Sequence, residues 1–95
     1  MQFTERLRDP IKRGKVTCSI RIWQRPHVKV GGRYPLRPGH IEVTSVKEIT
    51  LKDVTATLAR KSGFATRADL LKIAKHGPGD RVFLIDFVYV EEPPV

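Results

Sequence analysis

Polar side chains recur at every second position near the start of the chain, in the stretch that follows Gly14. The polar positions are Lys15, Thr17, Ser19 and Arg21. Because successive side chains of a β-strand point to opposite faces, these four share one face, and the apolar residues between them share the other. Two cations and two hydroxyls are the donors that suit a phosphate or the edge of a nucleobase. We therefore take this face as a candidate ligand-binding surface.

Two residues of this strand allow contrasting interpretations. Arg21 could bind a phosphate or a base through bidentate hydrogen bonds, or it could form a structural ion pair with a carboxylate such as Asp86. Trp23 continues the same face and could stack on an unpaired base, or close the apolar core as a lid. Both alternatives stay open at this point.

Further cations follow the strand without interspersed acids. They are Arg25, Lys29, Arg33 and Arg37. A run of cations without acids is typical of loops that contact the phosphates of a nucleic acid. Taken singly, each of the four could equally be a solvated surface charge. We predict that the first three contribute to ligand binding.

The positive charge is confined to one half of the chain. Through Lys47 there are eleven Lys and Arg against three Asp and Glu, whereas from Glu48 onward there are seven of each sign. The net charge of +8 therefore belongs to the first half. A field restricted in this way favours a polyanionic partner, since evenly scattered charge would serve solubility equally well.

The cysteine and histidines predict no metal site and no cofactor. Cys18 is the single cysteine, which excludes an internal disulfide and a multi-cysteine zinc cluster, and its place on the apolar strand face favours a packed thiol. The three histidines are separated by spacings unlike those of metal ligands. They are His27, His40 and His76.

The length of 95 residues predicts a single domain over 1–95, with residues 92–95 as a frayed tail. No apolar run approaches the roughly 20 residues that span a bilayer, so we expect no membrane partner. The charged start of the chain lacks the apolar stretch of a secretory signal, which predicts a cytoplasmic location.

In the basic half, residues 4–13 predict a short helix with Thr4 as its N-cap, kinked or restarted at Pro10 and ended by Gly14. Alternation then predicts strands over 15–23 and 40–47, joined by a hairpin-like passage and a turn at 37–39. In the second strand, Ile41, Val43 and Ser45 should face one way. Glu42, Thr44 and Val46 should face the other.

The neutral half changes to helical spacing. Residues 50–61 predict a weak helix that ends near Gly63, and a second helix follows Thr66, which Asp69 joins in a near capping box. The second helix should stop at residues 77–79. Residues 81–91 are almost entirely apolar and predict a central strand covered on both faces. Strands around a helical middle imply an α+β fold, with a small curved sheet or barrel and helices to one side.

Four stretches in this order resemble the ASCH domain (activating signal cointegrator homology), a family of the PUA-like superfamily. They are residues 11–21, the turn at 30–34, Ser62-Gly63-Phe64, and residues 78–82. The resemblance spans nearly the whole chain. It implies a small PUA-like β-barrel with two or three helices packed at one side, and a cleft into which the glycine-lysine-arginine strand faces.

Members of this family are associated with nucleic-acid binding, and some are enzymes. One bacterial type of this size deacetylates N4-acetylcytidine, and others are described as ribonucleases. The catalytic lysine, threonine and glutamate of the deacetylating type correspond here to Val16, Ser19 and Ser62. Of these three functional groups, only the hydroxyl, on Ser19, is kept. A nucleophilic Ser19 would then need another base, either Lys15 or a histidine.

The sequence therefore predicts an RNA-binding or nucleotide-binding module rather than an enzyme. A small hydrolase acting on a modified nucleoside or on RNA, with Ser19 and Lys15 in catalysis, is the alternative. A third possibility is a protein adaptor that uses the neutral half. The oligomeric state and the natural ligand stay open.

Overall fold

In the computed structural model the described residues are 3–74 and 79–91, and over these ranges the chain has four strands, three α-helices and one 3-10 helix. The helices are α1 (Glu5–Lys12), η1 (Leu51–Asp53), α2 (Ala56–Lys61) and α3 (Arg67–Ala74). The strands are β1 (Cys18–Trp23), β2 (Arg33–Leu36), β3 (Gly39–Ile49) and β4 (Arg81–Val90). The expected α+β class is confirmed.

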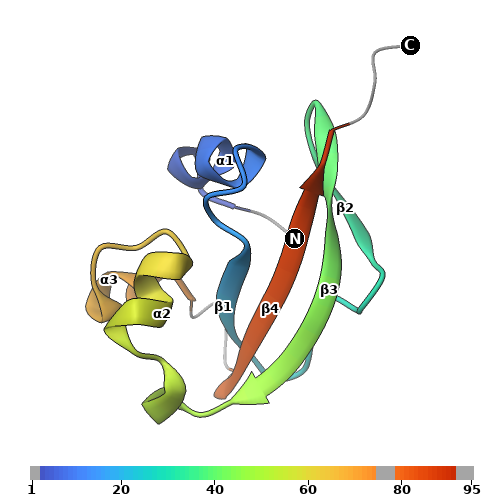
Figure 1. The fold of residues 1–95 in the computed structure, drawn as a ribbon. Coiled ribbons are helices and arrows are strands. Elements are labelled where there is room, and N and C mark those ends of the chain that lie inside the picture. The colour runs from blue at the N-terminus through green and yellow to red at the C-terminus, as the bar shows by residue number, and fades with distance from the viewer. Residues whose placement is uncertain (1–2, 75–78, 92–95) are drawn as a thin grey trace.

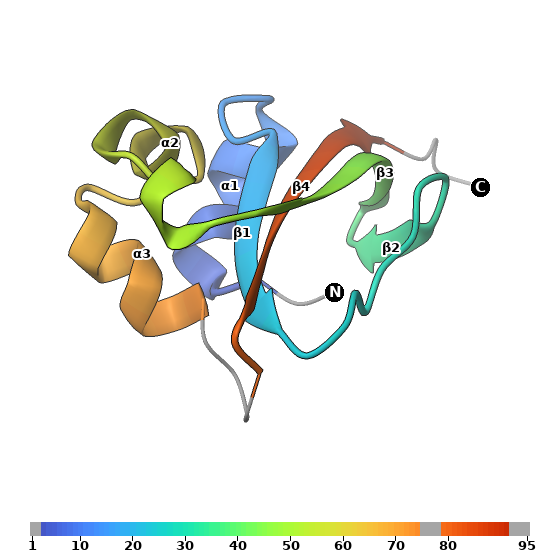
Figure 2. The same ribbon diagram turned by 90° about the horizontal axis from the view of Figure 1, so that it is seen from below.

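The strands form one curled antiparallel sheet in the order β1-β4-β3-β2. The apolar strand β4 therefore lies between β1 and β3, as its composition predicts. The three α-helices gather beside β1, and the β2–β3 hairpin lies at the other side of the sheet (Figure 1; Figure 2). One end of the molecule is thus helical, and the other is a two-stranded hairpin.

Cross-strand pairing divides the residues of β1 and β4 between two faces. Directly paired residues share a face. The face we call the Phe87 face carries Ser19, Arg21, Trp23, Phe83, Ile85 and Phe87. The opposite face, the Ile20 face, carries Cys18, Ile20, Ile22, Val82, Leu84 and Asp86.

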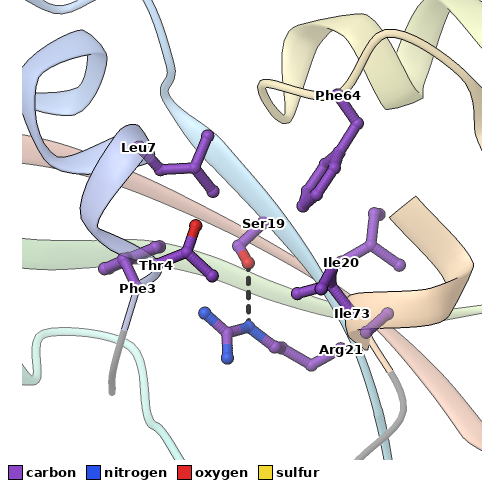
Figure 3. Close-up of a pocket in the computed structure, with 9 residues that line it drawn as sticks. Phe3, Thr4, Leu7, Ser19, Ile20, Arg21, Phe64 and Ile73 are labelled. Atoms are coloured by element: carbon purple, nitrogen blue, oxygen red, sulfur yellow. Dashed lines mark hydrogen bonds between the residues drawn. The ribbon is translucent and has the colours of Figure 1, made fainter. Parts of the chain in front are cut away.

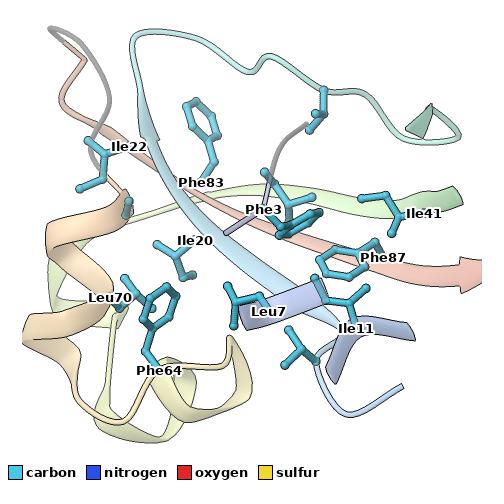
Figure 4. Packing of buried hydrophobic residues seen from close by; sticks show 14 of the residues in the cluster. Phe3, Leu7, Ile11, Ile20, Ile22, Ile41, Phe64, Leu70, Phe83 and Phe87 are labelled. Atoms are coloured by element: carbon cyan, nitrogen blue, oxygen red, sulfur yellow. The ribbon is translucent and has the colours of Figure 1, made fainter. Parts of the chain in front are cut away.

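Apolar packing covers β1 on both faces. The Phe3 ring packs against Phe87 with ring centroids 5.5 Å apart, and Phe64 and Leu70 approach Ile20 from the other side (Figure 4). Ile20 is 4 % exposed and Ser19 is 8 % exposed. The expected buried face of this strand is confirmed, and from Cys18 onward the face expected to be polar is also covered.

The first strand begins three residues later than predicted. The backbone N–H groups of Lys15 and Val16 both donate to the carbonyl of Pro10, which holds these two residues in a turn against the end of α1. Helix α1 itself continues through Pro10 without a restart. Thr4 occupies the N-cap position, but its side chain makes no capping hydrogen bond.

The predicted face assignment of the second strand is wrong beyond Val43. A β-bulge at Thr44 shifts the register, so that Ser45 pairs with Asp86 on the Ile20 face and Val46 pairs with Ile85 on the Phe87 face. An extra residue in one strand reverses every side chain that follows it. Ile41 and Val43, before the bulge, are buried as expected.

The single helix predicted over 50–61 is also wrong, because two threonines each start a separate helix. Thr50 and Asp53 form a capping box at η1, and the Thr55 hydroxyl accepts a hydrogen bond from the Leu58 N–H at the start of α2. Gly63 follows α2 with a φ of +93°, as predicted for a C-terminal glycine.

The later elements follow the prediction closely. Helix α3 is preceded by Thr66, whose hydroxyl accepts from the Asp69 N–H, and β4 matches the predicted central strand. Val88 and Val90 are exposed, however, because the helices cover the sheet at its β1 side. The predicted helix stop at 77–78, His76 and the tail at 92–95 lie outside the described residues.

Candidate functional site

A cavity of about 360 Å³ opens at the outer edge of β1, between α1 and α3. Its lining is Phe3, Thr4, Leu7, Ser19, Ile20, Arg21, Phe64, Ile73 and Ala74. Figure 3 shows Thr4 and Leu7 on one side of the Ser19 and Arg21 pair, and Phe64 and Ile73 on the other. We call this space the edge cavity.

The polar centre of the edge cavity is a pair of side chains from the same strand face. Arg21 Nε donates to Ser19 Oγ at 2.9 Å, and the Arg21 guanidinium lies 5.3 Å from the Phe3 ring centroid. Burial lowers the pKa of Arg21 below its ordinary value. Because a guanidinium remains protonated in proteins, this group stays charged in an apolar setting, where its electrostatic interactions are strengthened.

The walls of the cavity are apolar and come from separate segments. Phe64 stands between α2 and α3, Phe3 precedes α1, and Ile73 is 42 % exposed on α3. Such a lining, with few polar groups and a volume within the roughly 300–1,000 Å³ of ligand pockets, is typical of a small-molecule site. No periodicity in the sequence links these three positions, which explains why sequence reasoning missed them.

A second depression of about 400 Å³ adjoins the edge cavity and shares Thr4, Phe64 and Ile73 with it. Arg6 and Lys72 bring positive charge to this depression, and Asp69 brings one negative charge. The Arg6 guanidinium lies 4.9 Å from the Phe64 ring centroid, and its Nη1 donates to the Gly63 carbonyl at 3.1 Å. These two contacts hold Arg6 in the lining of the second depression.

Of the predicted binding residues, Ser19 and Arg21 line the edge cavity, and the rest lie elsewhere. Lys15 and Thr17 are exposed in the segment before β1. Trp23 is 6 % exposed, with its ring stacked on His27 at 4.5 Å and tilted against Phe83 at 6.2 Å. This packing corresponds to the core-lid interpretation of the tryptophan.

The remaining predicted cations belong to the β1–β2 connection and the hairpin. Arg25 and Lys29 are exposed in the connection, and Arg33 on β2 pairs with Glu42 at 3.4 Å. A shallow depression at the hairpin is lined by Arg33, Pro35, Arg37, Pro38, Gly39 and His40. None of the basic residues that follow β1 in sequence, from Arg25 to Arg37, lines the edge cavity.

The alternative ion pair between Arg21 and Asp86 does not form, because the two side chains lie on opposite faces of the sheet. Asp86 is paired with Cys18 on the Ile20 face. There the Cys18 thiol lies 3.5 Å from the Ser62 hydroxyl. Burial raises the pKa of the Cys18 thiol, and the hydrogen bond to Ser62 partly opposes that rise. Cys18 is thus a buried protonated thiol, as the apolar position predicts.

The geometry around Ser19 provides no base for nucleophilic catalysis among the described residues that line the cavity. The group hydrogen-bonded to its hydroxyl is the Arg21 guanidinium, which cannot accept a proton. Lys15, the base considered from sequence, does not line the cavity. The Ser19 hydroxyl is thus oriented by a cation and not by a base.

Over the described ranges, no group of three His, Cys, Asp or Glu residues is placed to hold a metal ion. None of the described helices has the length and apolar character that a bilayer crossing requires. Comparisons of the chain with protein families, with curated proteins and with solved structures find no match.

Proposed function

We propose that this chain is an RNA-binding module of the ASCH type, which holds one nucleotide of a single strand in the edge cavity. The observation that carries the proposal is the Arg21–Ser19 pair, a charged donor and a hydroxyl set between the aromatic residues Phe3 and Phe64. Unpaired bases are bound by stacking and by hydrogen bonds to their edges, and phosphates by charged donors. The cavity offers both kinds of group within one small volume.

Two further features support the proposal. Two of the four stretches on which the ASCH resemblance rests, residues 11–21 and Ser62-Gly63-Phe64, contribute lining residues to the edge cavity. The curled antiparallel sheet with helices at one side agrees with a small barrel-like α+β fold. The charge of the first half supplies the field that attracts a polyanion.

The test is the affinity of the purified protein for a fluorescently labelled single-stranded RNA, measured by anisotropy over a series of salt concentrations. We expect affinity to fall steeply with salt, because phosphate contacts release counterions. Replacing the partly buried cation in Arg21→Ala should weaken binding about 10- to 100-fold, the range expected for a charge-assisted hydrogen bond.

The matched control is Arg37→Ala, which removes the same charge from the exposed hairpin. An exposed contact of this kind should cost less than about 5-fold. Thermal unfolding of both variants establishes that they remain folded. Binding that is independent of salt, or equal losses in the two variants, would contradict the proposal.

A further inference from the structure

Strand β1 is an edge strand over the described residues, because the sheet order places β4 on one side of it and no strand on the other. The backbone N–H and C=O groups on the open side of an edge strand have no ladder partner. They bond to water, to a covering segment or to a ligand. The backbone hydrogen bonds between β1 and β4 determine which residues of β1 present such groups to the open side.

One hydrogen bond shows which residues of β1 are bonded to β4. The Phe87 N–H donates to the Thr17 carbonyl at 3.0 Å, and Thr17 precedes Cys18, which is paired with Asp86. In an antiparallel pair, residues alternate between those bonded to the neighbour and those facing away. Ser19 and Arg21 therefore bond to β4, whereas the backbone groups of Cys18, Ile20 and Ile22 point to the open edge.

Of the three outward-facing residues, Ile20 lines the edge cavity and Cys18 and Ile22 do not. The pairing with β4 directs the Ile20 N–H and C=O to the side of β1 on which the cavity opens. Its neighbours in the chain, Ser19 and Arg21, project into the same space from the Phe87 face. The cavity thus combines a backbone donor and acceptor with a hydroxyl and a guanidinium.

We propose that the backbone N–H and C=O of Ile20 read the hydrogen-bonding edge of the nucleobase held in the edge cavity. The inference rests on the proposed function and adds the group that selects the base. The two backbone groups of one strand residue point the same way, which matches the neighbouring donor and acceptor on the pairing edge of a base. Phe64 and Ile73 on one side, and Phe3 on the other, supply apolar cover for a flat ring.

The length of open edge in the cavity favours a ring over an added peptide strand. Strand addition needs hydrogen bonds at several alternate residues. The edge cavity presents one such residue, since Cys18 and Ile22 lie outside its lining. A base needs no more than the single donor and acceptor that Ile20 offers.

The first test compares Ile20→Pro with Ile22→Pro. Proline removes the backbone N–H, and it is tolerated in edge strands where that N–H faces outward. Both isoleucines are buried on the same face, so both variants lose similar packing, but Ile20→Pro also removes the donor in the cavity. We expect Ile20→Pro to weaken binding of single-stranded RNA about 3- to 10-fold more than Ile22→Pro, the effect of one lost hydrogen bond. Equal losses would overturn the inference.

The second test needs no variant and decides the question if the proline variants fail to fold. Amide resonances of the wild-type protein are followed by NMR during titration with the four ribonucleoside 5′-monophosphates, and with derivatives methylated on the pairing edge. We expect a selective shift of the Ile20 amide, lost with the methylated derivative of the preferred base. The inference would be overturned if a nucleotide bound without shifting the Ile20 amide resonance. Equal shifts of the Cys18, Ile20 and Ile22 amide resonances would also overturn it.

The two proposals fail in different ways. RNA binding that retains its Arg21 dependence while the Ile20 amide stays unmoved contradicts the backbone contact and leaves the RNA-binding function standing. A selective Ile20 shift with a mononucleotide, in a protein that does not bind RNA, supports the backbone contact and contradicts the RNA-binding function.

Discussion

Gly63 sets how closely α1 approaches the end of α2. Its φ of +93° lies in the left-handed region, and a Cβ added there would collide with Leu7 Cδ2 and come within 3.3 Å of Val16 Cγ2. We expect Gly63→Ala to lower the free energy of unfolding by more than the ~1–2 kcal/mol that left-handed backbone costs an ordinary residue. The collision adds to the backbone strain. Urea unfolding monitored by circular dichroism measures the loss.

The matched control is Gly14→Ala, because Gly14 has a similar φ of +74° but no heavy atom beyond its chain neighbours within 4 Å of the added Cβ. The difference between the two variants isolates the close approach of Leu7. Equal losses in Gly63→Ala and Gly14→Ala would mean that α1 yields freely at this point. The wall of the edge cavity, which includes Leu7, would then be adaptable rather than fixed.

At the same scale, sequence reasoning identified the polar centre of the cavity but not its walls. Ser19 and Arg21 are two residues apart, so strand alternation alone placed them side by side. Phe3, Phe64 and Ile73 come from segments far apart in the chain, and only tertiary packing brings them together. For Trp23 the sequence allowed two environments, and burial against Phe83 and His27 distinguishes them.

Among the elements, α3 is tied to the preceding 3-10 turn by one side chain. Arg67 donates from Nε to the Val54 carbonyl at 2.7 Å and from Nη2 to the Leu51 carbonyl at 3.0 Å. We expect Arg67→Met to lower the free energy of unfolding by about 1 kcal/mol, because two charge-assisted hydrogen bonds are lost at a solvent-exposed position. Urea denaturation provides the measurement.

Arg60→Met is the comparison, since among the described residues the Arg60 guanidinium donates only to the Thr57 hydroxyl of its own helix, at 3.5 Å. That change should stay within about 0.5 kcal/mol. If the two arginine variants were equally stable, the Arg67 contacts would carry no net stabilisation. The position of α3, and with it of Ile73, would then depend on apolar packing.

Element types followed from the sequence more accurately than their boundaries. Turn glycines and apolar periodicity predicted α1, α3, β3 and β4, because these signals are local. The bulge at Thr44 and the late start of β1 depend on cross-strand register and on the Pro10 carbonyl, which no local pattern reveals. The break between η1 and α2 had a local signal in Thr50 and Thr55, which apolar spacing concealed.

At the scale of the whole molecule, strand order was the decisive feature that the sequence did not provide. The alternating strand was expected to face a cleft, yet it lies at the edge of the sheet, so the cavity opens beside its backbone as well as its side chains. The excess of positive charge does lie in the first half of the sequence. In space, however, Arg6, Arg21 and Lys72 lie on the cavity side, whereas Arg33 and Arg37 lie on the hairpin.

This division predicts that the hairpin cations act on long ligands and not on short ones. The edge cavity lies at the β1 side of the sheet, and Arg37 lies on the hairpin at the β2 side of a molecule 44 Å long. We expect Arg37→Gln to leave mononucleotide affinity unchanged and to weaken binding of a long single-stranded RNA. The slope of log affinity against log salt should fall by about 0.7, the value for one phosphate contact on a single strand. Lys52→Gln removes the same charge from the exposed turn of the neutral half, and it should leave that slope unchanged.

Equal slopes in the two variants, or a loss of mononucleotide affinity in Arg37→Gln, would contradict the prediction. Net charge alone would then attract the ligand, and the ligand would not contact the hairpin.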